Sequence, residues 1–303
     1  MRLLLVDAPN LAMRAIHAMA KQGLTNASGV PTGPLLAFIN GIGKHVREER
    51  PDRVVVCWDG GRSAFRVKID PEYKGHRIAP PEEFENYRLD TFGLIKRFCV
   101  LANLFQIERK GEEADDLIAS YVAAREPQDT IVILSSDHDF LQLLGPQVEQ
   151  VRLSSANVPT DRWTEGRVVE EYRCEPRHLA YAMAIAGDAG DNVIGAPRYG
   201  MKTAIKALAK HDFSLNATLT EEVRLAPHMR QVLTSYLLVN LVEPEHLVDV
   251  PAPPRFVPTD VGSLVWPSLM QFLLDYEMNS VIRRIYDETL WREGVRGLTL
   301  PDL

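Results

Sequence analysis

Acidic side chains recur just beyond the short apolar runs of this sequence and at the starts of its helical patterns. The runs 2–6, 53–58 and 130–134 are rich in β-branched residues, as is typical of buried parallel strands, and an aspartate follows each within three residues. Because the carboxyl ends of parallel strands form the edge at which α/β sheets bind ligands, we expect these acids to converge there. The candidates are Asp7, Asp59, Glu113, Asp115, Asp116, Asp137, Asp139, Asp188 and Asp191.

Converging carboxylates repel one another unless cations lie between them. Basic residues are scarce in these segments, since no Lys or Arg occurs within 113–124 or 131–151. Hard oxygen ligands select Mg²⁺ or Mn²⁺, and two such ions about 4 Å apart form a clamp for in-line phosphodiester hydrolysis. Taken singly, each acid also fits an ordinary role as a helix N-cap or as an acid that offsets a helix dipole. Taken together, they predict a centre of two or more metal ions that activates water.

The elements that must position these acids alternate along the first half of the chain. Helical patterns at 34–49 and 113–125 lie between the apolar runs. This alternation predicts an α/β domain whose central, mainly parallel sheet is flanked by helices. Later the chain is expected to be helical, with a proline-rich crossing after about residue 243 and a last helix at about 262–288. We therefore expect an α/β core at 1–174 and a mainly helical domain at 175–303.

Net charge argues mildly against a nucleic-acid partner, but the distribution of charge does not. The formal charge is −7, from 34 basic and 41 acidic residues, and two divalent ions would reduce it to −3. Basic residues gather in 62–77, with a local charge of +3, and in 198–210, with +4 and no acid. Such stretches suit contacts with a phosphate backbone. The segment 60–82, with three prolines, three glycines and five basic residues, predicts a long functional or disordered loop.

The cysteines and the lengths of the apolar runs argue against several other classes of protein. Three widely spaced cysteines without a C-x-x-C pair argue against a disulfide framework and against a zinc knuckle. The start of the sequence is too short and too soon acidic for a signal peptide, and no apolar run approaches the roughly 20 residues that span a bilayer. We expect a cytoplasmic protein without a membrane partner; the resemblance described next implies a bacterial or phage-infected cell.

Five blocks carry a resemblance to the 5′-nuclease (flap endonuclease) family of bacterial and phage type, which includes the 5′→3′ exonuclease domain of bacterial DNA polymerase I. They cover roughly two thirds of the chain and occur in the family's order: LLLVDAPNLAMRA (3–15), VVVCWDGGRSAFRVKIDPEYKGHR (54–77), GEEADDLIASY (111–121), LSSDHDFLQLL (134–144) and GDAGDNVIGAPRYGMKTAIKAL (187–208). The resemblance implies a PIN-like nuclease core, a helical arch at about 60–100 over the metals, and a C-terminal helical DNA-binding subdomain. Its helix–turn–helix-type duplex-binding motif would lie at about 187–210.

The resemblance also implies a role for each matched position. The tighter metal site, which holds the catalytic ion, corresponds to Asp7, Asp59, Glu113, Asp115 and Asp116. The second metal site corresponds to Asp137, Asp139, Asp188 and Asp191. Lys74 would approach the scissile phosphate, and Arg14 would face the active site.

DNA contacts follow from the same resemblance. Arg66 and Arg77 would hold the 5′ single strand, and Tyr73 would either stack on an unpaired base or pack in the interior. The duplex would be held by Arg198, Lys202 and Lys206. The family's Gly-Ile-Gly hairpin, which often holds K⁺, is replaced here by Arg198-Tyr199-Gly200; loss of its first glycine restricts positive φ and leaves a K⁺ site in doubt.

Together with these residues, the resemblance implies a Mg²⁺-dependent, structure-selective 5′-nuclease that acts as flap endonuclease and 5′→3′ exonuclease. Its expected substrates are DNA with a 5′ flap or 5′ end, and RNA primers in RNA/DNA hybrids. We expect a monomer, served by replication proteins in trans. The alternatives are a PIN-like ribonuclease, a non-catalytic DNA-junction binder and a phosphatase-like hydrolase. The arch and the 187–208 block argue against the first, the complete set of acids with Lys74 against the second, and the two basic stretches against the third.

Overall fold

The computed structural model describes residues 1–20, 22–152, 160–242, 247–257 and 265–287. Its centre is a six-stranded sheet in the order β3-β2-β1-β4-β5-β6, in which every pairing is parallel except that of β5 with β6. The strands are β1 (Arg2–Asp7), β2 (Arg53–Trp58), β3 (Phe105–Glu108), β4 (Thr130–Leu134), β5 (Val148–Arg152) and β6 (Asp161–Trp163). The α/β fold class is confirmed, and the three predicted strands are β1, β2 and β4.

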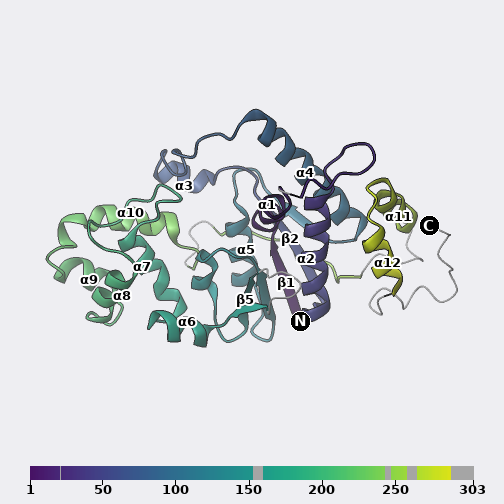
Figure 1. The fold of residues 1–303 in the computed structure, drawn as a ribbon. Coiled ribbons are helices and arrows are strands. Elements are labelled where there is room, and N and C mark those ends of the chain that lie inside the picture. Colours follow the sequence, from purple (N-terminus) through teal and green to yellow (C-terminus); the bar gives the residue numbers. More distant parts are fainter. Residues whose placement is uncertain (21, 153–159, 243–246, 258–264, 288–303) are drawn as a thin grey trace.

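The sheet is buried on both faces, which is why its central strands are continuous apolar runs. Successive residues of β1 alternate between two cores. Leu3 and Leu5 belong to the core beneath α5 (Ala114–Ala123), whereas Leu4 and Val6 belong to the core beneath α1 (Ala8–Met19), α2 (Gly33–Glu49) and α4 (Glu82–Leu101). The helices therefore lie in a layer on each side of the sheet (Figure 1).

The segment that we expected to form an arch contains more regular structure than the sequence indicates. A short helix, α3 (Ala64–Ile69), lies within the predicted loop, and Ser63 caps it by accepting a hydrogen bond from the Arg66 N–H. A turn at 71–76 follows, and then the 20-residue α4. In Figure 1 this segment passes above the edge of the sheet at which the strands β1 and β2 end.

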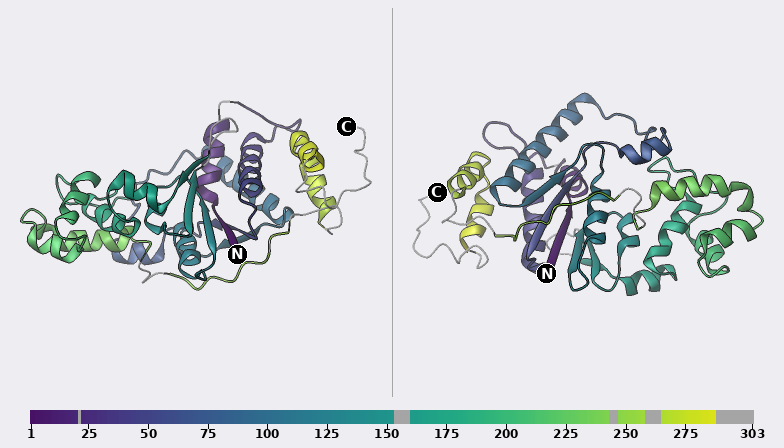
Figure 2. Two further views of the ribbon diagram at one scale, coloured as in Figure 1. Left: turned by 90° about the horizontal axis from the view of Figure 1, so that it is seen from below. Right: turned by 180° about the vertical axis from the view of Figure 1, so that it is seen from behind.

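Helices form most of the described residues beyond β6, but they lie at two opposite ends of the molecule (Figures 1 and 2). One group comprises α6 (Glu165–Tyr172), α7 (Leu179–Ala186), α8 (Met201–Ala209), α9 (Leu215–Glu221) and α10 (Met229–Val239). The other comprises α11 (Trp266–Asp275) and α12 (Asn279–Asp287). Helix α11 packs against α4 and α12 packs against α2, and both contribute to the core that also contains α1. The expected division at 174/175 remains a prediction, and residues 266–285 share a core with the N-terminal sheet.

An extended segment, 247–257, connects these two groups along the amino ends of the strands (Figure 2). The Phe256 N–H donates to the carbonyl of Asp52 over 2.8 Å, immediately before β2. The Tyr121 hydroxyl donates to the carbonyl of Pro251 over 3.0 Å, and the Asn103 amide donates to that of Val257 over 2.7 Å. Prolines have no N–H to donate, so this segment is held largely through its carbonyls. In the described part of the chain, no helix combines the length and apolar character needed to cross a membrane.

Candidate functional site

The first acidic group lies at the point where the strand order of the sheet reverses, between the parallel strands β1 and β4. Asp7 ends β1 and caps α1, since its Oδ1 accepts the Asn10 N–H over 3.2 Å. Ser135, just beyond β4, donates its hydroxyl to Asp7 Oδ2 over 2.6 Å. The Asp137 N–H donates to Ser135 Oγ, and the Asp139 N–H donates to Asp137 Oδ1. The parallel register therefore brings acids more than 120 residues apart to one sheet edge, the position at which such sheets bind ligands.

The second acidic group depends on the close approach of two backbones after β2 and β3. Gly60 donates its N–H to the Glu112 carbonyl over 2.8 Å and accepts the Gly111 N–H over 3.0 Å. A Cβ at Gly60 would lie 1.7 Å from the Arg109 carbonyl oxygen, so only glycine fits. This contact places Asp59 against the first turn of α5, where its Oδ1 accepts the Ala114 N–H over 2.8 Å.

Burial of these acids disfavours their charged forms. Burial, with the nearby carboxylates of Asp59 and Asp137, raises the pKa of Asp7 to about 7 despite the Ser135 hydrogen bond. Burial, with Asp137, Asp188 and Asp191, raises the pKa of Asp139 to about 8. The pKa of Asp115 is raised well above its ordinary value by burial and by Asp7. A divalent cation removes such a penalty, so this all-oxygen set fits a hard metal ion.

Although basic residues are scarce in the acidic segments themselves, the 62–77 segment supplies basic partners to three of the nine acids, Glu113, Asp116 and Asp191. Lys74 Nζ lies 2.8 Å from Glu113 Oε2 and 3.5 Å from Asp191 Oδ2. The Tyr73 hydroxyl lies 3.1 Å from Glu113 Oε2 and 3.0 Å from Asp191 Oδ2. Arg77 Nη2 lies 2.6 Å from Asp191 Oδ1. Tyr73 and Lys74 thus join one acid from each of the two expected metal sites.

Tyr73 and Lys74 are held by the backbone as well as by their side chains. Lys74 has φ +55°, which is unusual for a residue other than glycine, and its N–H donates to the Asp191 carbonyl over 2.9 Å. Burial alone would lower the pKa of Lys74, but Glu113, Asp115 and Asp191 raise it above its ordinary value, so the amine stays charged. Tyr73 is only 2% exposed, which corresponds to the packed alternative rather than to a base-stacking ring.

Arg66 occupies a different place from the one expected. It is 2% exposed, and its Nη1 and Nη2 each lie 2.8 Å from an oxygen of Asp116. Its Nε donates to the Leu238 carbonyl at the end of α10 over 2.8 Å, and Nη1 lies 3.4 Å from Glu113. Arg66 is therefore inaccessible to a DNA strand, and both oxygens of Asp116 are engaged by the guanidinium. The expected strand-holding role does not fit a guanidinium in this interior position.

Replacing Arg66 by methionine is expected to lower the free energy of unfolding by about 3–5 kcal/mol, because it leaves the buried carboxylate of Asp116 without its cation. Arg77→Met is the matched control, since Arg77 is 57% exposed and such pairs contribute about 1 kcal/mol at most. Urea unfolding of both variants measures the difference. Equal losses in the two variants would contradict the role assigned to the Arg66–Asp116 pair.

The stability of the metal-free protein is expected to fall as pH rises from about 4 to about 8. The pKa values of Asp7 and Asp139 in the folded state, about 7 and about 8, exceed the 3.8 of an ordinary aspartate. Within this window the unfolded chain has lost protons that the folded chain retains, so folding is progressively disfavoured. Thermal unfolding in EDTA at several pH values measures this decline, and Mg²⁺ should reverse it. A midpoint that rises over the same window would contradict the assignment.

The basic residues of the helical group are exposed and aligned. Arg198 lies in the loop before α8, and Lys202 and Lys206 lie four residues apart on α8, so these two lysines share a helix face. Arg198 has φ +68°, so the missing glycine does not prevent a positive φ at this position. Arg14 is exposed on α1. Within the stretch 187–210, where a helix–turn–helix-type motif was expected, residues 187–200 form a loop that follows α7 and residues 201–209 form α8, so the motif remains a prediction.

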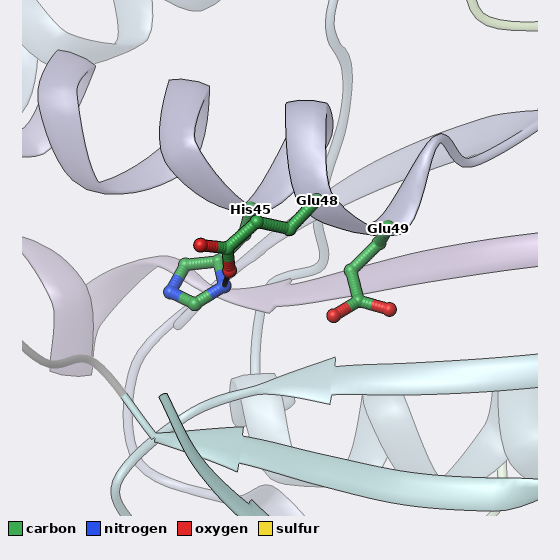
Figure 3. Close-up of side chains that lie close together, drawn as sticks. All are labelled: His45, Glu48 and Glu49. Carbon is green, nitrogen blue, oxygen red and sulfur yellow. Dashed lines mark ion pairs between the residues drawn. The ribbon is translucent and has the colours of Figure 1, made fainter. Parts of the chain in front are cut away.

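Sequence reasoning did not single out one further cluster, on α2 (Figure 3). His45, Glu48 and Glu49 form the one group of three His, Cys, Asp or Glu residues, among those described, whose ligand atoms all lie within 4.8 Å. Both oxygens of Glu49 already bind guanidinium groups, those of Arg2 and Arg162. Its charge is therefore neutralised, and the cluster does not fit a divalent cation. The nine predicted acids include no such tight trio in the described structure.

Comparison with known proteins agrees with this geometry. A Bacillus subtilis protein named 5′-3′ exonuclease is 32% identical over 232 residues, which are 76% of each chain. DNA polymerase I of Rhizobium leguminosarum is 30% identical over 305 residues, which are 93% of this chain and 28% of the relative. The chain thus spans little more than a quarter of the length of that polymerase and of the similar mycobacterial ones.

Two solved structures share the fold. The structure of T5 5′-exonuclease with bound divalent zinc ions aligns with a TM-score of 0.64 and 23% identity, over 80% of this chain and 90% of that one. The catalytic core of Rad2 in complex with a DNA substrate aligns with a TM-score of 0.55 and 13% identity, over 97% and 92%. Residues 2–173 match the family described as "5′-3′ exonuclease, N-terminal resolvase-like domain". The chain therefore belongs to the 5′-3′ exonuclease family.

Proposed function

We propose that this protein is a divalent-metal-dependent, structure-selective 5′-nuclease that hydrolyses DNA at the junction of a 5′ single strand and a duplex. The observation that carries the proposal is the contact of Lys74 with Glu113 and Asp191, because it brings a cation of the 62–77 segment to the acidic sheet edge. A family relative named 5′-3′ exonuclease, similar over three quarters of both chains, supports the reaction class. We propose that RNA primers are also substrates. We further propose that the protein acts in the cytoplasm, where flap-containing DNA occurs.

The acids at the sheet edge would hold the metal ions. Asp7, Asp59, Glu113 and Asp115 are proposed for one site, and Asp137, Asp139, Asp188 and Asp191 for the other. Bound Mg²⁺ or Mn²⁺ supplies an activated water and neutralises charge on the phosphate. Asp116 is proposed instead to hold Arg66, since both its oxygens face that guanidinium.

The chain's own cations then contact the substrate. Lys74 would exchange Glu113 for an oxygen of the scissile phosphate and stabilise the charge that develops there. Arg77, exposed beside it, would hold the 5′ strand. The exposed Arg198, Lys202 and Lys206 would contact the duplex backbone without reading its sequence. A K⁺ ion near 198–200 is not part of the proposal.

The test is cleavage of a 5′-labelled flap duplex in Mg²⁺ and in EDTA, beside the matching single strand, the blunt duplex and a flap with RNA at its 5′ end. Junction-centred cuts that require the metal are expected. Equal cutting of plain single-stranded RNA would favour the PIN-like ribonuclease. Tight binding of the flap without cleavage in Mg²⁺ or Mn²⁺ would favour the non-catalytic junction binder. Cleavage of the DNA–RNA flap decides whether primers are substrates.

A further inference from the structure

A cavity of about 290 Å³ lies at the edge of the molecule opposite the acids. It is bounded by the second half of α2, the end of α4, the 247–257 segment and helices α11 and α12. Pro51 and Leu104, which line it, directly precede β2 and β3. The acids follow the opposite ends of the strands, and six residues of strand span about 20 Å. An occupant of this cavity would therefore leave the acidic edge open.

The interior of the cavity is apolar, and one glycine enlarges it. Ile42, Val46, Phe98 and Leu269 are among the side chains that line it. Gly43 lies among them within α2, although glycine lowers the stability of a helix relative to alanine. A Cβ at Gly43 would lie 3.4 Å from Arg47 Nη1, which is ordinary contact. The absence of a side chain at Gly43 thus keeps space open beside a guanidinium.

Three arginines and no carboxylate line the cavity, within the part of the chain that the structure describes. Arg47 lies on α2, Arg50 follows the end of α2, and Arg284 lies on α12. The Nη2 of Arg284 donates to Asn40 Oδ1 over 2.6 Å. Arg50 is exposed. The chain as a whole has a net charge of −7, whereas the charged side chains around this apolar cavity are all positive. It is complementary to an apolar group that carries negative charge beside it.

We propose that this cavity binds an acidic peptide segment of a partner protein, with one large apolar side chain inserted and carboxylates placed on Arg50 and Arg284. The cavity has room for one large apolar side chain, and interfaces concentrate affinity in single buried anchors. The mostly apolar lining favours a peptide with an apolar anchor over a nucleic-acid backbone, which needs polar contacts along its length. The partner would thus be carried on the side away from the proposed nuclease site.

The experiment measures fluorescence anisotropy of a short labelled peptide in which one tryptophan is flanked by aspartates. We expect micromolar binding, weakened about tenfold or more when the tryptophan is replaced by alanine or the aspartates by lysine. Arg50→Glu and Arg284→Glu should each weaken binding about tenfold, as should Gly43→Leu, which fills the cavity. Arg224→Glu, at an exposed arginine of the helical group, is the matched control and should change nothing. Thermal unfolding verifies that each variant is folded.

Several outcomes would overturn the proposal. These are absence of binding at millimolar peptide, equal binding of the lysine or alanine peptide, and indifference to both arginine substitutions. Self-association of the chain that Arg50→Glu abolishes would assign the cavity to a second copy instead. Cleavage of flap DNA by Arg50→Glu should stay within about twofold of the parent rate, as for a distant surface change. The binding readout does not depend on catalysis, so its failure is distinguishable from a failure of the proposed nuclease function.

Discussion

Replacing Asp7 by asparagine is expected to lower the rate of DNA cleavage by about a thousandfold or more, while the metal-free protein becomes at least as stable as the parent. The loss follows because Asp7 lies at the centre of the acidic edge, within hydrogen-bonding distance of Ser135, and an amide carries no charge for a metal ion. The stability is retained because burial raises the pKa of Asp7 to about 7, which means that the fold disfavours a charged carboxylate at this position. A neutral amide avoids that penalty.

Two measurements separate these effects for Asp7→Asn. Single-turnover cleavage at saturating Mg²⁺ gives the rate, and urea unfolding in EDTA at about pH 8 gives the stability. Asp275→Asn, on the distant α11, is the matched control for a change of one carboxylate to an amide. Unchanged cleavage by Asp7→Asn would remove this residue from the metal-binding set. A metal-free variant markedly less stable than the parent would show that the Asp7 charge is satisfied within the chain itself.

Replacing Lys74 by alanine is expected to lower the single-turnover rate by about a hundredfold to a thousandfold, with a much smaller effect on DNA affinity. A positioned donor that faces developing charge contributes this much in other enzymes. The carboxylate neighbours of Lys74 raise its pKa, so the ammonium of the parent persists throughout the neutral and moderately alkaline range. The ratio of parent to variant rates should therefore stay constant over that range.

Lys68→Ala is the matched control for Lys74→Ala, since Lys68 is an exposed lysine of the same segment, on α3. Quenched-flow cleavage and equilibrium binding in Ca²⁺ provide the rate and the affinity separately. Equal losses in the two lysine variants would indicate only a general loss of positive charge near DNA. A loss of affinity that accounts for all of the lost cleavage would contradict a role for Lys74 at the scissile phosphate.

The sequence alone suffices for the centre of the fold and for the convergence of the acids. Strands β1, β2 and β4 are continuous apolar runs because both faces of the sheet are buried. Strand β5 was missed because it contains polar residues: Gln150 is fully buried, and its amide donates to the Ser135 carbonyl over 3.0 Å. Strand β6 has only three residues, too few for a periodicity. Local pattern does not reveal a polar residue whose partner lies elsewhere in the fold.

The sequence pattern does not predict which basic and hydroxyl groups contact the acids. Arg66 and Asp116 are 50 positions apart, and nothing in their spacing shows that one guanidinium takes both oxygens of one carboxylate. Tyr73 and Asp191 are 118 positions apart. Their type and neighbourhood suggested DNA contacts, whereas burial and tertiary pairing decided their positions. The exposed basic residues of α8, by contrast, were predictable because a helix face is a local property.

The attachment of α11 and α12 to α2 and α4 has a consequence for synthesis of the protein. The core that these last helices cover, with Trp266, Leu269 and Phe272, includes β1, which is synthesised long before them. More than 100 residues separate the end of β6 from α11, so at about 5–20 residues per second the nascent sheet waits roughly 5–20 s for its cover. During that interval the apolar surface that α11 and α12 later cover is accessible to chaperones and to neighbouring nascent chains.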